Sequence, residues 1–301
     1  MKILLLGKNG QVGWELQRSL AVIGEVVALD RHPVASPYGP IHGDLSDLEG
    51  LRDTIRRVQP QVIVNAAAYT AVDKAETDRE LARTVNALAS QVLAEEALQL
   101  DALLVHYSTD YVFDGSGTRA WKETDAVSPI NWYGATKLEG EQLIVASGCK
   151  HLILRTSWVY AARGNNFAKT MLRLAKERPA LNVIADQIGA PTGAELLADI
   201  ATAALQQTLL RPETCGIYHL APAGETSWHE YAQFVIDFAR EHGELLAVEA
   251  INAIPTTQYP TPAQRPLNSR LDTDKLRQTF SLHLPDWQSG VTRMLMEVLN
   301  K

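Results

Sequence analysis

Cysteine, positive charge and long apolar runs are scarce in this chain of 301 residues. The two cysteines, Cys149 and Cys215, form no CxxC pair and no metal-finger spacing, which predicts reduced thiols in a cytoplasmic protein. The net charge of −7 argues against a general nucleic-acid binder, because such a protein needs a basic face. No apolar run is long enough to span a membrane, and the apolar start is too short for a signal peptide. We therefore expect a cytoplasmic globular protein that binds neither nucleic acid nor membrane.

The first half of the chain alternates short apolar runs with helical patterns. Because the runs are continuously apolar, they are typical of parallel strands covered on both faces. The expected strands are Lys2–Gly7, Glu25–Asp30, Gln61–Asn65, Ala102–Ser108 and His151–Ser157. The expected helices are Gln11–Ile23, Asp47–Val58, Arg79–Leu98 and Asn131–Ser147. This alternation predicts an α/β fold with a doubly wound parallel sheet of the Rossmann type.

After Ser157 the alternation loosens, which predicts a smaller second lobe. Helices are expected near Asn166–Glu177, Ala194–Leu209, Trp228–His242 and Trp287–Leu299, and strands near Asn182–Ala185 and Gly216–Leu220. Four prolines in Ile254–Pro266 predict an extended loop. We expect a Rossmann domain over residues 1–157. Residues 158–301 are expected to form mainly the smaller C-terminal lobe, with some segments returning to the first domain.

A glycine-rich turn, Gly7-Lys8-Asn9-Gly10-Gln11-Val12-Gly13, follows the first strand and opens a helix. Gly7 permits a tight turn, Gly10 lets the backbone approach a pyrophosphate, and Gly13 lets helix and strand pack closely. Backbone N–H groups at the helix start then face the phosphates. The turn predicts a dinucleotide site in residues 1–157, which leaves the later lobe for substrate; a simple tight turn is the alternative.

Acidic residues and a small-residue turn follow the next strands. Asp30 ends the second strand, where a carboxylate can hold ribose hydroxyls, but Arg31 beside it favours a 2′-phosphate. The choice between NADH and NADPH therefore stays open. Asp44 either approaches the adenine or caps the helix that starts near Asp47. The small residues after Asn65 would let a cofactor lie against the backbone.

Tyr133 and Lys137 lie four residues apart on an expected helix, so both side chains share one face. Reduction of a ketone needs a proton donor as hydride arrives. A nearby ammonium can lower the pKa of a phenol toward neutrality, and we expect Lys137 to do so for Tyr133. Thr109 follows a strand at the same edge, where its hydroxyl can orient the substrate oxygen. We choose Thr109 over Ser108 because side chains at a strand end alternate between faces.

With these residues in order, the chain resembles the dTDP-4-dehydrorhamnose reductases of the extended short-chain dehydrogenase/reductase family. The resemblance runs over residues 1–301 and rests on GKNGQVGWELQ, NAAAYTAVDKAE, HYSTDYVFDG, SPINWYGATKLEGE, LRTSWVY, GNNFAKTML, DQIGAPTGAELLAD and YPTPAQRPLNSRL. It implies NAD(P)H-dependent reduction of the 4-keto group of dTDP-4-dehydro-L-rhamnose to dTDP-L-rhamnose. That product feeds cell-surface polysaccharides, including the O antigen of lipopolysaccharide.

The resemblance also implies a role for individual residues. Tyr133 would donate the proton, Lys137 would assist it and bind the ribose, and Thr109 would tune the phenol. The implied cofactor-lining residues are Gly10, Gln11, Val12, Asp30, Asp44, Leu45, Ala68, Tyr69, Thr70 and Tyr107.

A further set of residues would meet the dTDP-sugar. Asp110 and Trp158 are implied as sugar-nucleotide contacts, with an indole face available to a ring; core packing is the alternative for Trp158. Arg265 is the candidate for the diphosphate, because a guanidinium is a planar bidentate donor. Asn166 and Asn268 would add neutral hydrogen bonds, unless they only form turns.

Some members of the family bind Mg²⁺ through glutamates at a homodimer contact. Glu15, Glu195 and Glu297 occupy the matching positions, and their hard oxygen ligands suit Mg²⁺. Ordinary exposed helix residues are the alternative, because spacing in the sequence cannot assemble them.

Two other functions remain open at this point. The chain could be a sugar-nucleotide epimerase or dehydratase of the same fold. It could also be a non-catalytic binding module, like the reductase-like regulatory subunit of some methionine adenosyltransferases. The complete set of Thr109, Tyr133 and Lys137 argues against the module.

Overall fold

Six parallel strands form the central sheet in the computed structural model, which describes residues 1–300. They are β1 (Lys2–Leu6), β2 (Glu25–Leu29), β3 (Val62–Asn65), β4 (Leu103–Thr109), β5 (His151–Thr156) and β10 (Gly216–His219). The order is β10-β5-β4-β3-β1-β2, and each neighbouring pair is parallel. The predicted doubly wound parallel sheet is confirmed. Because β1 lies between β2 and β3, its carboxyl end is the switch point where such sheets bind ligands.

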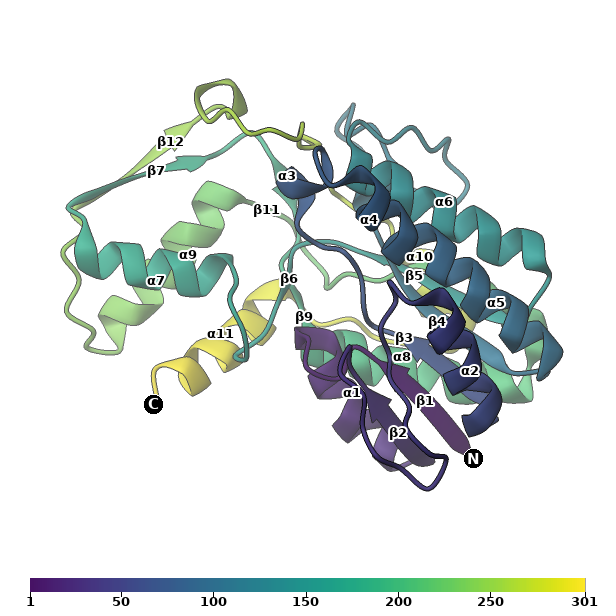
Figure 1. The fold of residues 1–301 in the computed structure, drawn as a ribbon. Coiled ribbons are helices and arrows are strands. Elements are labelled where there is room, and N and C mark those ends of the chain that lie inside the picture. The colour runs from purple at the N-terminus through teal and green to yellow at the C-terminus, as the bar shows by residue number, and fades with distance from the viewer. Residues whose placement is uncertain (301) are drawn as a thin grey trace.

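Helices cover both faces of the sheet (Figure 1). The side chains of β1 point alternately to the two faces of the sheet, and both faces are apolar. Ile3 and Leu5 pack with one set of helices, and Leu4 and Leu6 pack with the other. The first set is α1 (Gln11–Ala21), α8 (Ala194–Leu210) and α10 (Asp274–Phe280), and the second is α2 (Leu48–Val58), α5 (Ala89–Gln99) and α6 (Trp132–Ser147). No helix within residues 1–300 is both long and apolar enough to cross a membrane.

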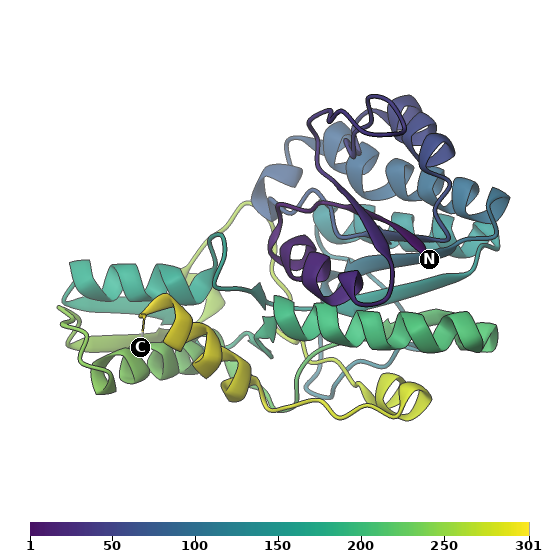
Figure 2. The same ribbon diagram turned by 90° about the horizontal axis from the view of Figure 1, so that it is seen from below.

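A second lobe lies to one side of the sheet (Figure 2). It consists of α7 (Phe167–Glu177), α9 (Trp228–Glu241) and α11 (Trp287–Val298) around a parallel pair, β7 (Ala180–Ile184) and β12 (Ala250–Ile254). The rings of Tyr231 and Trp287 meet edge to face in its core, with centroids 5.7 Å apart. Ser227 and Glu230 form a capping box that fixes the start of α9. This lobe thus has a hydrophobic core of its own.

The second half of the chain contributes to both cores. Leu197 of α8 and Leu276 of α10 belong to the cluster under the central sheet, whereas α7, α9 and α11 build the second lobe. Two short pairs join the crossing segments: β6 (Val159–Tyr160) with β9 (Thr192–Gly193), and β8 (Ile188–Gly189) with β11 (Thr226–Ser227). The chain therefore passes between the lobes several times.

The structure corrects several predicted boundaries. The expected helix Arg79–Leu98 is divided into α4 (Arg79–Arg83) and α5 by a π-helical turn at Thr84–Leu88. β12 and α10 were not predicted, because β12 is largely exposed and only Leu276 and Phe280 are buried in α10. The remaining short elements are α3 (Val72–Ala75) and the 3-10 turns Asp110–Val112, Pro212–Thr214 and Thr256–Gln258.

A buried ion pair joins α6 to β5. Arg155 contacts Glu141 at 2.6 Å, and both side chains are at most 3% exposed. We expect Glu141→Ala to lower the free energy of unfolding by about 3–5 kcal/mol, because it leaves a buried guanidinium unpaired. The matched control is Glu177→Ala, which removes the exposed Arg173–Glu177 pair and should cost roughly 0.3–0.5 kcal/mol. Urea denaturation measures both, and equal losses would contradict the assignment of Glu141 to the core.

Candidate active site

The glycine turn occupies the switch point between β1 and β3. Gly7 has φ +86°, and its N–H donates to the carbonyl of Leu29 at 2.9 Å. A Cβ on Gly13 would lie 2.0 Å from the carbonyl oxygen of Gly7, and one on Gly7 would lie 2.9 Å from the nitrogen of Ala67. Only glycine therefore permits the close packing of β1, α1 and the turn after β3.

The start of α1 is open to an anion. Gly10 is the N-cap and supplies no side-chain hydrogen bond, and the first turn holds no acidic residue. The N–H groups of Gln11, Val12 and Gly13 thus have neither a capping side chain nor a neighbouring carboxylate on the helix. This end of α1 suits the pyrophosphate of a dinucleotide, because the helix dipole and the N–H groups favour negative charge.

Asp30 lies beside this turn at the end of β2. Its carboxylate accepts hydrogen bonds from the side chain of Asn9 and from the backbone N–H of His32. Asp44 forms a local turn with Ser46, and the side chain of Asp47 caps α2. The alternative that Asp44 is the helix cap is therefore wrong. Leu45, next to it, is only 3% exposed and packs in the core under α2.

The turn after β3 is held by a residue that the sequence analysis missed. Asn86, 1% exposed, accepts from the N–H of Tyr69 at 2.8 Å and donates to its carbonyl at 3.2 Å. It also donates to Thr136 of α6 at 3.1 Å. Asn86 lies in the π-helical turn, a feature frequent at functional sites. Asn86 therefore fixes the backbone beside Ala68 and Thr70.

Tyr133 and Thr109 meet at the carboxyl end of β4. Tyr133 lies in the first turn of α6, whose N-cap Asn131 accepts from the N–H of Gly134. A Cβ on Gly134 would be 2.2 Å from the carbonyl of Tyr111, so this glycine lets α6 approach the 3-10 turn after β4. The Thr109 hydroxyl donates to Oδ1 of Asp110 at 3.0 Å and lies close enough to the Tyr133 phenol to lower its pKa. Ser108, which we did not choose, is also buried, and its hydroxyl has no hydrogen-bond partner within residues 1–300.

Lys137 lies behind this pair and contacts β4. Its Nζ donates to the carbonyl of Tyr107 at 2.6 Å and lies 3.0 Å from Nε2 of His106. The Tyr107 phenol points the other way and donates to the carbonyl of Leu197 in α8. Burial lowers the pKa of Lys137 to about 8.

The structure does not bear out the expected acidification of the phenol. Burial raises the pKa of Tyr133 to about 12, against the lowering effect of the Thr109 hydrogen bond. The physical reason lies in the contacts of Lys137, whose Nζ is engaged by His106 and the Tyr107 carbonyl. Burial also favours the neutral phenol over the phenolate.

Asp110 and Trp158 flank the site. Asp110 is 3% exposed, burial raises its pKa to about 6, and its Oδ2 has no hydrogen-bond partner among the described residues. Trp158 has φ +50° and stacks on Trp228, with ring centroids 3.6 Å apart. One face of the Trp158 indole therefore packs on Trp228 and is closed to a sugar.

The other predicted substrate residues differ in whether their polar atoms already have hydrogen-bond partners. Arg265 pairs with Asp73 at 2.9 Å, but its buried Nη1 has no partner among residues 1–300. Asn166 caps α7 and also donates to the carbonyl of Ala161. The amide of Asn268 donates to two backbone carbonyls and accepts from Arg270. Of these three, only Arg265 presents an unused polar atom.

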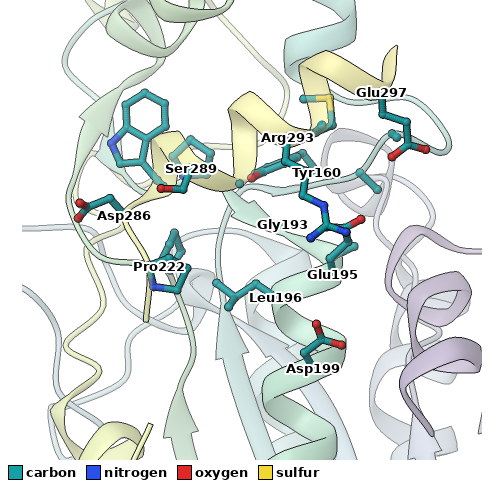
Figure 3. A pocket seen from close by; sticks show the side chains of 18 residues that line it. Tyr160, Gly193, Glu195, Leu196, Asp199, Pro222, Asp286, Ser289, Arg293 and Glu297 are labelled. Carbon is teal, nitrogen blue, oxygen red and sulfur yellow. The ribbon is translucent and has the colours of Figure 1, made fainter. Parts of the chain in front are cut away.

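Two of the three glutamates, Glu195 and Glu297, lie at a hollow between α8 and α11 (Figure 3). Glu195 pairs with Arg293 at 3.2 Å. Burial and the charge of Glu195 raise the pKa of Glu15, so the carboxylates sense one another. In the described part of the chain, no group of three or more His, Cys, Asp or Glu side chains could hold a metal ion.

Comparisons with known proteins decide the family. The model of the RmlD substrate binding domain matches residues 1–300. The dTDP-4-dehydrorhamnose reductase of Salmonella typhimurium is 57% identical over 298 residues, covering 99% of this chain and 98% of the relative. The chain belongs to the dTDP-4-dehydrorhamnose reductase family. The reductase of Burkholderia thailandensis is 47% identical over 308 residues and matches along the whole of both chains.

Solved structures of this reductase family share the fold. A dTDP-4-dehydrorhamnose reductase from Bacillus anthracis in complex with NADP has a TM-score of 0.86 at 33% identity, covering 98% of this chain and 99% of that one. A UDP-glucose 4-epimerase from Thermus thermophilus, at 21% identity and a TM-score of 0.80, shares the fold alone. The relatives favour the reductase over the epimerase and binding-module alternatives.

Proposed function

We propose that this chain reduces the 4-keto group of dTDP-4-dehydro-L-rhamnose to dTDP-L-rhamnose with NAD(P)H. The observation that carries the proposal is the placement of three groups at the carboxyl end of β4. Thr109 lies close enough to the Tyr133 phenol to lower its pKa, and Lys137 donates to the carbonyl of Tyr107. This set is complete in a chain 57% identical to a dTDP-4-dehydrorhamnose reductase. A coupled assay that follows NAD(P)H absorbance with 4-keto sugar nucleotides tests the reaction directly.

The residues divide the work of a ketone reduction. The nicotinamide supplies hydride when bound. Tyr133 donates its phenolic proton to the substrate oxygen, while Thr109 hydrogen-bonds and orients the reacting groups. A phenol with a pKa of about 12 can still do so, because an alkoxide is a far stronger base than a phenolate. Lys137 binds the nicotinamide ribose through its Nζ.

The phenolic proton is the first point to test. We expect Tyr133→Phe to lower kcat by about 100-fold or more with nearly unchanged cofactor binding, since only the proton donor is lost. Tyr231→Phe is the matched control, because that buried hydroxyl has no partner within the described residues and lies in the second lobe. Near-normal turnover of Tyr133→Phe would refute the role.

Asp30 is proposed to select the cofactor, and the glycine turn with Asp44, Leu45, Ala68, Tyr69, Thr70 and Tyr107 would line it. If the Asp30 carboxylate holds the ribose diol, Asp30→Ala should weaken the binding of NADH by about tenfold, a loss of about 1.4 kcal/mol. The binding of NADPH should weaken by less. Dissociation constants from fluorescence titration measure this. Equal losses of affinity for both cofactors would contradict the assignment. Arg31→Ala should instead weaken the binding of NADPH more than that of NADH.

The second lobe is proposed to bind the dTDP-sugar over the site. Two unpaired buried atoms support contacts to substrate: Oδ2 of Asp110 and Nη1 of Arg265. Arg265 would bind the diphosphate and Asp110 the sugar, whereas Trp158 would offer only the part of its indole that Trp228 leaves free. Asn166 and Asn268 would shape the loops around the nucleotide through their capping and turn bonds.

A homodimer with Mg²⁺ between copies is a further part of the proposal. Besides burial, the charges of Glu195 and Glu297 raise the pKa of Glu15, which supports the proposal because neighbouring carboxylates favour a hard cation. A single chain would supply an incomplete ligand set, and a second copy would complete it. We expect Mg²⁺ to shift sedimentation toward dimers, with loss of the shift in Glu15→Gln. An unchanged distribution with and without Mg²⁺ would rule this out.

We also propose that the enzyme works in the cytoplasm, in dTDP-rhamnose synthesis for cell-surface polysaccharides such as lipopolysaccharide. The match to dTDP-4-dehydrorhamnose reductases over 99% of the chain supports this assignment. Loss of rhamnose from the polysaccharides of a deletion strain tests it.

A further inference from the structure

A line of three buried polar side chains ends at the candidate active site. Asn65 closes β3, His106 lies beside it on β4, and Lys137 of α6 contacts His106. None is more than 2% exposed. Asn65 Nδ2 lies 3.2 Å from His106 Nδ1, and His106 Nε2 lies 3.0 Å from Lys137 Nζ. The ketone reduction derived above uses Lys137 and leaves Asn65 and His106 without a role.

The hydrogen bonds fix which nitrogen of His106 carries the proton. Oδ1 of Asn65 accepts from the N–H of Ala67 at 3.2 Å, so the amide turns its Nδ2 donor toward His106. Nδ1 of His106 must then be the acceptor, and the ring proton resides on Nε2. That N–H faces Lys137 Nζ, which can accept it only as a neutral amine. The neutral amine keeps hydrogens to donate to the Tyr107 carbonyl.

An ammonium at Lys137 requires a different arrangement. Nε2 of His106 would need a lone pair, which moves the ring proton to Nδ1. Asn65 would then have to turn Oδ1 toward the ring, and the Ala67 N–H would lose its acceptor. The third hydrogen of the ammonium would also need a new acceptor. The two proton states of Lys137 thus correspond to two settings of the Asn65–His106 pair.

Within residues 1–300, no charged group around Lys137 determines its protonation state, which therefore depends on Asn65 and His106. On α6, Glu141 lies one turn away, but Arg155 of β5 binds its carboxylate at 2.6 Å. Tyr133 on the same helix is neutral, because burial raises its pKa to about 12. On β4, the Tyr107 phenol points to α8, and burial keeps the pKa of His106 well below its usual range. Burial also lowers the pKa of Lys137 to about 8.

We propose that Asn65 and His106 hold Lys137 as a neutral amine in the cofactor-free protein at alkaline pH, and that cofactor binding converts it to an ammonium. The ribose hydroxyls would supply the missing acceptor. Solvent provides the added proton, and His106 keeps a single proton that moves from Nε2 to Nδ1. Asn65 and His106 are therefore positioning residues that act through Lys137. The second half of the proposal rests on the proposed role of Lys137 as a ribose ligand.

The tautomer of His106 tests the cofactor-free state without any assumption about activity. Long-range ¹H–¹⁵N spectra of ¹⁵N-histidine protein, assigned with His106→Gln, should show the proton on Nε2 at about pH 9, one unit above the pKa of Lys137. Addition of NADPH without substrate should move it to Nδ1. A proton on Nδ1 in the cofactor-free protein would overturn the inference.

Proton uptake during NADPH binding is the second measurement. Calorimetry in buffers of different ionisation enthalpy at about pH 9 should give close to one proton taken up per site, and about none in Lys137→Met. Asn65→Asp is the variant that tests the role of the Asn65–His106 pair most directly. Its carboxylate accepts from both the Ala67 N–H and the ring Nδ1–H, so Lys137 is already charged and uptake should fall to near zero. Its His106 proton should reside on Nδ1 before NADPH is added.

His219→Gln is the matched control, because His219 is also buried and neutral but bonds to the carbonyl of Trp121. The His219→Gln chain should take up as many protons per site on NADPH binding as the parent chain. Uptake that is equal in the parent chain, Asn65→Asp and Lys137→Met would overturn the proposal. If Asn65→Asp does not fold, the proposal is tested by proton uptake in the parent chain and in Lys137→Met, together with the tautomer of His106. Failure of NADPH to bind at all would instead contradict the proposed function.

Discussion

The parallel order of the strands is the constraint on which the site depends. Because parallel strands all end at one edge, the segments after β1, β3 and β4 meet there although they lie far apart in the sequence. Leu6 is paired with Asn65, and Asn65 with His106, so the glycine turn, the small-residue turn and Thr109 emerge side by side. The helix dipole of α1 adds an anion site at the same edge.

Burial then determines the chemistry of the polar groups at that edge. A polar group inside the protein costs free energy unless its hydrogen bonds are made, and most of the buried side chains there have defined partners. Asn86 meets both backbone groups of Tyr69, and Lys137 meets β4. The same burial favours neutral forms, which raises the pKa of Tyr133 and lowers that of Lys137. Orientation and protonation at this site therefore have one physical origin.

The second lobe supplies a different kind of contact. It has its own aromatic core, while α8 and α10 return to the sheet. Trp158, where the chain leaves the sheet domain, stacks on Trp228 at the start of α9. The unpaired buried atoms of Asp110 and Arg265 remain available at the same site. A polar substrate with a flat base and a diphosphate matches this combination of donors, acceptor and indole.

The sequence by itself determined the parallel α/β sheet, the glycine turn and the family, because these depend on local periodicity, on glycine spacing and on ordered motifs. It also grouped Thr109, Tyr133 and Lys137, since strand ends and an i, i+4 spacing are local features. Only the tertiary structure decided that His106 links Asn65 to Lys137, that Asn86 holds the Tyr69 turn, and that Trp228 covers one face of Trp158. It also gathered Glu15, Glu195 and Glu297. Contacts between distant segments leave no periodic trace in a sequence, and burial, which sets the protonation of each group, arises only when the chain packs.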